Sequence, residues 1–317
     1  MADVKKIATR DSYGEALVEL GAQNPDMIVL DADLAHATKT LAFQKAYPDR
    51  FFNCGIAEQN MMSIAAGIAA TGKLVFASTF AMFAAGRAYE QVRNSIGYPH
   101  LPVKIGATHG GLSVGEDGAS HQCCEDFALM RAIPGMTVIC PADYVEAKKA
   151  VLAAAKHDGP VYFRFGRLAV PVLFNENDYS FELGKGILLG EGKDVTIVAT
   201  GLMVGEAIAA REQLKNEGIS ARLINMPTIK PIDREILVAA ARETGAIVTT
   251  EEHSIIGGLG GAVAETLSGI CPVPIIRHGV EDEFGHSGPA LEVLKHYGLT
   301  AEKIVAQAKQ AIALKNS

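Results

Sequence analysis

Short apolar segments of the strand type alternate with helical segments along almost the whole of this 317-residue chain. Such alternation is typical of parallel sheets, whose neighbouring strands are joined by right-handed helical crossovers. We therefore predict an α/β fold with two doubly wound, mostly parallel three-layer domains. The strands of the first domain are predicted at Met27–Leu30, Phe51–Cys54, Leu74–Ser78, Val103–Ala107, Met136–Cys140 and Val161–Arg164. Helices are predicted between them near Ser12–Leu20, Ala57–Ala70, Met82–Ser95 and Asp143–Lys156.

The alternation is interrupted between Pro171 and Gly192, where asparagine, aspartate and glycine residues suited to turns are concentrated. We predict a linker at 171–192, which separates a first domain at 1–170 from a second at 193–317. The strands of the second domain are predicted at Val195–Ala199, Ala221–Asn225, Ala246–Thr250 and Val273–Arg277. Its glycine-rich turn Gly257–Gly261 matches the dinucleotide-binding fingerprint poorly, so we interpret it as a place of close backbone packing.

The bulk composition disfavours several classes of function. A net charge of −7, with no cluster of lysine and arginine, argues against a nucleic-acid partner. Glycine, proline and charged residues interrupt the apolar segments, so no membrane span is predicted, and segment 1–6 lacks a secretory signal core. The five cysteines include the adjacent pair Cys123 and Cys124, without disulfide-like or metal-like spacing. We interpret them as packing residues of a cytoplasmic protein, with a reactive thiol as the alternative.

The segment Gly55–Met61 places one carboxylate, that of Glu58, where a predicted strand ends and an apolar helix begins. The start of so apolar a helix is expected to be buried, and burial favours the neutral form of an acid. Glu58 is therefore a candidate catalytic group, with a simple helix cap as the alternative.

Two aromatic residues, Phe80 and Phe83, follow the next predicted strand. A helical turn would bring both rings to one face. Such a pair usually belongs to a core, but this one lies at the carboxyl end of a strand, where open parallel sheets bind ligands.

These motifs together resemble the C-terminal half of the transketolase family. The matching segments are Ala8–Gly14, Gly55–Asn60, Ser78–Phe83 and Thr108–Gln122. The resemblance implies a pyrimidine-binding domain followed by a transketolase C-terminal domain, with thiamine diphosphate as cofactor. It further implies that Glu58 hydrogen-bonds the pyrimidine ring of the cofactor and that Phe80 and Phe83 stack on that ring. Asp33 matches an acid near the cofactor, with Asp31 as the alternative.

The resemblance also implies residues that bind the substrate. His109, Asp117 and His121 match loop residues that hold the hydroxyls and carbonyl of a donor sugar, and His121 is assigned a catalytic role. Arg10 and Arg167 match two arginines that clamp the terminal phosphate, a task that suits a guanidinium fork. The alternative for His109 is a solvated loop histidine, and that for Asp117 is a plain turn. For Arg10 and Arg167 the alternative is exposed salt bridges.

Two positions depart from the family pattern. Ala37 stands where typical transketolases have a phosphate-binding serine, and Gly86 stands in place of a third aromatic of the cofactor pocket. The substrate is then expected to be an unusual sugar phosphate, or one that contacts His36 or Thr38 instead of the serine.

The largest departure concerns the metal. Full-length transketolases begin with a domain that binds the diphosphate through a metal ion, at a Gly-Asp-Gly motif followed by an asparagine, and this sequence has no such motif. We therefore predict one subunit of a split transketolase, with no metal ligands of its own. A partner subunit would supply the ligands of Mg²⁺ or Ca²⁺, in a two-plus-two heterotetramer. The activity implied is transfer of a two-carbon ketol unit from a ketose, or its phosphate, to an aldose, or its phosphate.

Two other functions remain as alternatives. The β subunit of a 2-oxo acid dehydrogenase shares the two-domain layout and the glutamate, but its substrate has no sugar hydroxyls for His109 and Asp117 to bind. A non-catalytic regulatory subunit would not need Glu58 together with Phe80 and Phe83.

Overall fold

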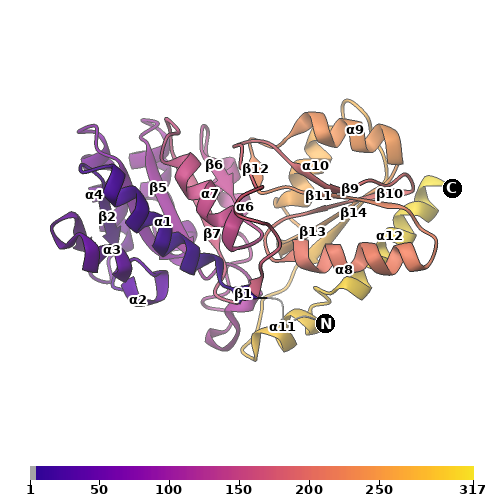
Figure 1. The fold of residues 1–317 in the computed structure, drawn as a ribbon, viewed down its shortest axis with the longest axis horizontal. Coiled ribbons are helices and arrows are strands. Elements are labelled where there is room, and N and C mark those ends of the chain that lie inside the picture. Colours follow the sequence, from indigo (N-terminus) through magenta and orange to yellow (C-terminus); the bar gives the residue numbers. More distant parts are fainter. Residues whose placement is uncertain (1–4) are drawn as a thin grey trace.

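The computed structural model describes residues 5–317 and contains two large sheets side by side, each with helices on both faces (Figure 1). Residues 1–4, part of the segment considered above for a secretory signal, lie outside the described residues. A short antiparallel pair, β1 (Lys6–Ile7) and β8 (Val170–Pro171), joins the two ends of the first half of the chain. Within residues 5–317, no helix is both long and apolar enough to cross a membrane.

The first sheet has seven strands in the order β12-β6-β7-β5-β4-β2-β3. All neighbours are parallel except β12 and β6, which form an antiparallel edge. Strands β4 and β5 are buried along their whole length, because helices cover both faces of the sheet. The strands are β2 (Ile28–Asp31), β3 (Phe51–Asn53), β4 (Val75–Phe80), β5 (Val103–Thr108), β6 (Thr137–Ile139), β7 (Val161–Phe165) and β12 (Thr228–Lys230).

Two groups of helices enclose this sheet as outer layers. One face is packed by α1, α3 and α7, and the other by α4, α5 and α6. The short helix α2 and the 3₁₀ turns Pro48–Arg50 and Leu112–Asp117 lie in the connections. The helices are α1 (Thr9–Gln23), α2 (Ala35–Thr38), α3 (Leu41–Ala46), α4 (Glu58–Ala69), α5 (Tyr89–Gln91), α6 (Asp126–Ala132) and α7 (Tyr144–Ala154).

The predicted continuous helix Met82–Ser95 is wrong. The structure has the short helix α5 between two π-helical segments, Phe83–Arg87 and Val92–Gly97. A π-helix fits one extra residue into a turn, which shifts every later side chain around the axis. Apolar periodicity cannot reveal such a shift, because alanine and glycine fill much of this segment.

The second sheet has five strands in the order β14-β13-β10-β11-β9, all parallel except the edge strand β9. Helices α8 and α12 pack on one face, and α9 and α10 on the other. The strands are β9 (Ile187–Gly190), β10 (Val195–Ala199), β11 (Ala221–Asn225), β13 (Ile247–Ser254) and β14 (Ile275–Val280). The helices are α8 (Met203–Asn216), α9 (Arg234–Thr244), α10 (Leu259–Leu267), α11 (Ala290–His296) and α12 (Ala301–Lys315).

Two strands cross the division that the sequence suggests. Strand β9 lies within the predicted linker 171–192, yet it pairs with β11 of the second sheet. Strand β12 comes from the second half of the chain, yet it pairs with β6 and closes the edge of the first sheet. The two sheets are therefore tied together by backbone hydrogen bonds as well as by the chain itself.

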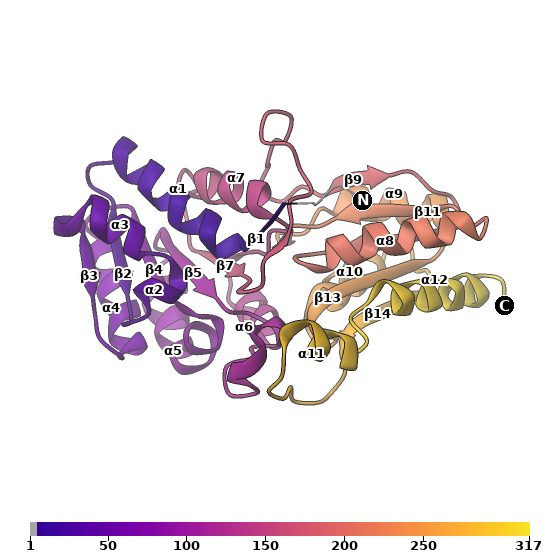
Figure 2. The ribbon, with the colours of Figure 1, turned by 60° about the horizontal axis from the view of Figure 1, so that its bottom comes forward.

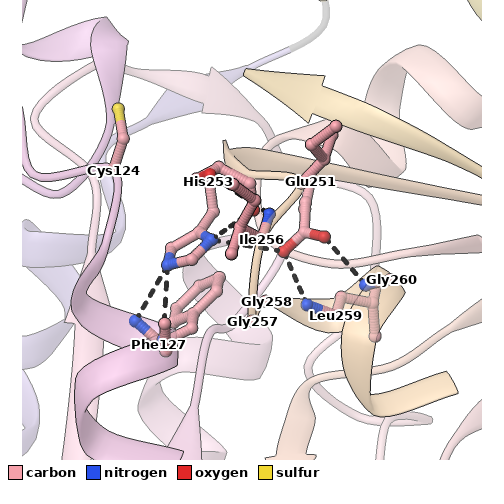
Figure 3. A network of polar contacts seen from close by, with 12 residues as sticks. Cys124, Phe127, Glu251, His253, Ile256, Gly257, Gly258, Leu259 and Gly260 are labelled. Carbon is pink, nitrogen blue, oxygen red and sulfur yellow. Dashed lines mark hydrogen bonds and ion pairs between the residues drawn. The ribbon is translucent and has the colours of Figure 1, made fainter. Parts of the chain in front are cut away.

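A buried polar network joins the two halves beside α6 and α10 (Figure 3). The His253 ring stacks on Phe127 at 4.7 Å, and its Nε2 accepts a hydrogen bond from the Phe127 backbone N–H at 3.1 Å. Burial lowers the pKa of His253 to about 3, so the ring is neutral and its Nδ1–H donates to the Ser254 carbonyl at 2.7 Å. Glu251 accepts from the N–H groups of Leu259 and Gly260 at 2.6 and 2.8 Å and so caps α10.

The glycine-rich turn has a packing role in this network. A Cβ added at Gly258 would lie 2.0 Å from Glu251 Oε2 and 2.6 Å from His253 Nδ1. Only glycine leaves room for these two side chains. The start of α10 is thus occupied by a carboxylate of the chain itself, in agreement with the packing interpretation of Gly257–Gly261.

Candidate active site

The carboxyl ends of the parallel strands in the first sheet collect the predicted site residues at one edge. Phe80 is the last residue of β4, His109 directly follows β5, and Arg167 comes two residues after the end of β7. Glu58 begins α4, which follows β3, the strand on the other side of β2 from β4. Because parallel strands end at the same edge, residues far apart in sequence meet here.

Glu58 is buried, with 2 % of its surface exposed, as the apolar helix predicts. An ion pair with Arg87 was not predicted: Arg87 Nη1 lies 3.0 and 3.1 Å from the two carboxylate oxygens of Glu58. In this arrangement the Glu58 carboxyl group faces a guanidinium, and not only the apolar surroundings that the start of α4 suggested. The π-helical segment Phe83–Arg87 places this cation, and the Arg87 guanidinium also covers the Phe83 ring at 4.5 Å.

The aromatic side chains form a continuous cluster beside Glu58. Phe80 and Phe83 are stacked with their centroids 5.8 Å apart. The His109 ring stacks on Phe80 at 3.8 Å, and the His121 ring meets Phe83 edge-on at 5.4 Å. The two phenyl rings and the two imidazole rings therefore form one cluster. The histidines belong to the loop that follows β5, whereas Phe80 is the last residue of β4.

His109 is held in one orientation. It is buried and has a φ of 58°, a left-handed conformation that is uncommon for a residue with a side chain. Its Nδ1 lies 2.9 Å from Thr108 Oγ1, and Arg10 Nη1 lies 3.2 Å from its Nε2. Burial, reinforced by the charges of Arg10 and Arg167, lowers the pKa of His109 to about 3. The ring is neutral, with Nε2 accepting from Arg10 and Nδ1–H facing the threonine.

Two arginines surround this histidine with positive charge. Arg10 also donates to the Ala37 carbonyl at 3.0 Å, and Arg167 donates to the Val114 carbonyl and to Glu116 at 2.8 Å. Burial and the Arg167 charge both lower the pKa of Arg10, whereas Asp11 opposes them. Arg10 thus faces the site. The positive charge of Arg167 is partly neutralised by Glu116, which precedes Asp117 in the loop.

The two aspartates after β2 have different environments. Asp31 is buried and accepts hydrogen bonds from Leu34 N–H and from Thr38 Oγ1 and Thr40 Oγ1 at 2.6, 2.7 and 2.9 Å. Asp33 is exposed and accepts from Asn53 Nδ2 at 2.9 Å. Asp31 therefore fastens the turn, and Asp33 is the carboxylate open to a ligand. Of the two residues expected to contact substrate in place of the serine, Thr38 is buried with its hydroxyl against Asp31, whereas His36 is exposed.

The loop between β5 and α6 holds the remaining predicted residues. Asp117 ends the 3₁₀ turn Leu112–Asp117 and is exposed. His121 is half-buried, and its Nδ1 lies 2.9 Å from Ser120 Oγ. Figure 2 shows α11 of the second half next to this loop. Among residues 5–317, no group of three or more His, Cys, Asp or Glu is arranged to hold a metal ion.

The sequence reasoning missed Arg87 and Lys39. Lys39 forms an ion pair with Asp11 at 3.1 Å, and its charge is among those that lower the pKa of His109. Arg87 lies four residues after Phe83, a spacing that would place the two side chains on one side of a helix. This spacing is the signal by which the sequence could have indicated Arg87. Lys39 lies in a left-handed turn (φ 71°), for which the sequence offers no comparable signal.

Comparison with known proteins identifies the family. The transketolase pyrimidine-binding domain model matches residues 5–172, and the transketolase C-terminal domain model matches residues 184–304. The chain belongs to the transketolase family. It matches the C-terminal half of full-length members of that family.

Individual relatives support this placement. A solved structure described as a split-gene transketolase, in an inactive β₄ tetramer, shares 55% identity and a TM-score of 0.90, over 98% of this chain and 100% of that one. A 6-deoxy-6-sulfo-D-fructose transketolase subunit from Clostridium sp. is 43% identical over 97% of this chain and 95% of its own length. Human transketolase is 39% identical over 98% of this chain but only 50% of its own length.

Proposed function

We propose that this chain is the C-terminal subunit of a split, thiamine-diphosphate-dependent transketolase that transfers a two-carbon ketol unit from a ketose phosphate to an aldose phosphate. The observation that carries the proposal is the joint placement of Glu58, the Phe80–Phe83 pair and the Arg10–His109 pair at one sheet edge. A buried carboxyl beside stacked rings suits an aromatic heterocycle, and neighbouring cations suit an anionic sugar.

The residues present fit the pyrimidine end of the cofactor. Phe80 is buried but Phe83 is only half-buried, so a face of the pair is accessible for stacking. Glu58 would hydrogen-bond the ring once the half-exposed Arg87 leaves its carboxylate, and Asp33 would lie near the ring. When bound, thiamine diphosphate supplies the carbon nucleophile and the electron sink that two-carbon transfer needs.

Substrate binding would use the cationic side of the site. His109 is neutral and its Nε2 accepts from Arg10, so a sugar oxygen would contact the ring only by taking the place of the Arg10 guanidinium at Nε2. His121 and Asp117 would contact the carbonyl and hydroxyls of the donor, and Arg10 and Arg167 its anionic end. The sulfonated sugar in the name of the clostridial relative agrees with an anionic group at that end.

The partner would be an N-terminal transketolase subunit that binds the diphosphate and Mg²⁺ or Ca²⁺. The chain spans half the length of human transketolase, and it matches the solved split-gene transketolase chain over 98% of its own length and 100% of that chain. Phe52 on β3, Ile56 in the connection before α4 and Ile64 on α4 are apolar but 49%, 78% and 38% exposed, and they flank Glu58 along the chain. We place the subunit contact over this surface, in a two-plus-two heterotetramer.

Reconstitution tests the proposal. The chain alone should show no ketol transfer and only weak cofactor binding, because ring stacking and one hydrogen bond amount to roughly millimolar affinity. Adding a diphosphate-binding transketolase subunit with magnesium should restore tight binding and sugar turnover. Calorimetry and a coupled aldose assay measure the two effects. Micromolar cofactor binding or turnover by the chain alone would contradict the split-enzyme proposal.

A further inference from the structure

The site loop, defined as residues 109–122, is held against a segment of the second half, residues 284–289, which we call the C-terminal wall. We propose that Gln122 is a positioning residue through which this wall sets the geometry of the sugar-binding loop. The part that concerns catalysis rests on the function proposed above.

The contacts of the Gln122 amide carry the inference. Gln122 is 5% exposed, and its Nε2 lies 3.2 Å from the Leu112 carbonyl, 3.3 Å from the Gly115 carbonyl and 3.0 Å from the His286 carbonyl. All three neighbours are carbonyl oxygens, which accept hydrogen bonds, so the atom that faces them is the amide nitrogen. If the amide were flipped, its oxygen would face three carbonyl oxygens with no hydrogen between them. One side chain therefore joins the start and the middle of the 3₁₀ turn to the wall.

Glycines make this close approach possible. A Cβ at Gly285 would lie 2.0 Å from Gln122 Oε1, and one at Gly118 would lie 2.3 Å from Ser287 Oγ. Gly118 and Gly115 also have positive φ values of 74° and 77°. A Cβ at Gly115 would meet the Gly288 carbonyl at 3.1 Å. A glycine thus stands opposite each of the side chains Gln122 and Ser287, which leaves room for the loop and the wall to approach closely.

The same loop is fastened at its start. The Ser113 N–H donates to Glu252 Oε1 at 2.5 Å, and Glu252 lies on β13 of the second sheet. A Cβ at Gly111 would lie 2.3 Å from the Glu252 carboxyl carbon. The second half of the chain therefore holds the loop at two separate points, Ser113 and Gln122.

His121 connects the contacts of Gln122 to the candidate active site. It precedes Gln122, and the backbone N–H groups of both residues donate to the Gly118 carbonyl at 3.0 and 3.1 Å. The position of Gln122 consequently fixes where His121 meets the Phe83 ring and where the exposed Asp117 stands. None of the predicted site residues lies beyond residue 170, so the wall would shape the sugar site without touching the sugar.

Gln122→Met tests the role, because methionine has nearly the same length and no amide. The assembled complex with its partner subunit is used throughout. Hydrogen exchange should speed up roughly tenfold in the site loop and the wall, about the value of one buried hydrogen bond, and stay unchanged in α1 and α12. Gln307→Met on α12, which removes an amide far from the loop, should leave both segments at the wild-type rate.

Kinetics separates positioning from folding. Gln122→Met should raise KM about tenfold for a ketose phosphate, whose distal hydroxyls would face Asp117, and less than about threefold for hydroxypyruvate, which lacks them, while cofactor affinity stays within about twofold of wild type. Unchanged exchange in both segments would overturn the inference, and so would equal losses with both donors. If the wild-type complex transfers no ketol unit, the proposed function fails, and the exchange experiment still decides whether Gln122 fastens the loop.

Discussion

Replacement of Glu58 by glutamine separates the chemistry of the site from its stability. The amide has the same shape as the carboxyl, so the burial and the packing of α4 are retained. What changes is the charge facing Arg87, whose Nη1 lies 3.0 Å from the carboxylate. Arg87 is half exposed, so water weakens its attraction to Glu58 compared with a fully buried ion pair. We therefore expect this ion pair to contribute about 1–2 kcal/mol to the free energy of unfolding. The first half of the chain should then melt roughly 2–8 °C lower.

The effect on catalysis should be far larger. An amide cannot provide the ionisable group that the cofactor ring needs, and loss of one positioned acid or base typically costs about a hundred- to ten-thousand-fold. We expect turnover of the assembled complex to fall by that factor at unchanged stoichiometry. Glu90→Gln, which removes an exposed acid from nearby α5, is the matched control and should retain turnover within about twofold. Near-normal turnover in a Glu58→Gln complex with full cofactor occupancy would refute the assignment of Glu58.

Three further predictions concern the loop and the buried network. Asp117→Ala should weaken turnover of a ketose phosphate more than that of hydroxypyruvate, because the small donor lacks distal hydroxyls; steady-state KM values compare them. Gly258→Ala should destabilise the protein by about 2 kcal/mol or more, since its Cβ would lie 2.0 Å from Glu251 Oε2; thermal melting measures this. Burial raises the pKa of Glu252 to about 7, so the wild-type protein loses stability as the pH rises from 4.5 to 7. Glu252→Gln carries no ionisable group and should become more stable relative to wild type over that window, as pH-dependent unfolding would show. A relative gain in stability on acidification would contradict the assignment.

The fold class could be predicted because its signals are local. Each buried strand is a short apolar run, and strands β5 and β7 begin at the predicted residues Val103 and Val161. Strands β10 and β11 have both predicted bounds, whereas other strand ends shift by one to four residues, since apolar patterns do not record where ladder hydrogen bonds stop. Strands β9 and β12 were missed because their partners lie on other parts of the chain.

The sequence by itself determined the family, the alternation of strands and helices, and the placement of Glu58 at a helix start. Only the tertiary structure decided that Arg87 pairs with Glu58, that His109 covers Phe80, and that Gln122 reaches a carbonyl 164 residues away. The physical reason is the range of the interactions involved. Propensity and periodicity act over a few neighbours, whereas these contacts exist only after strands from distant segments have aligned their ends at one edge.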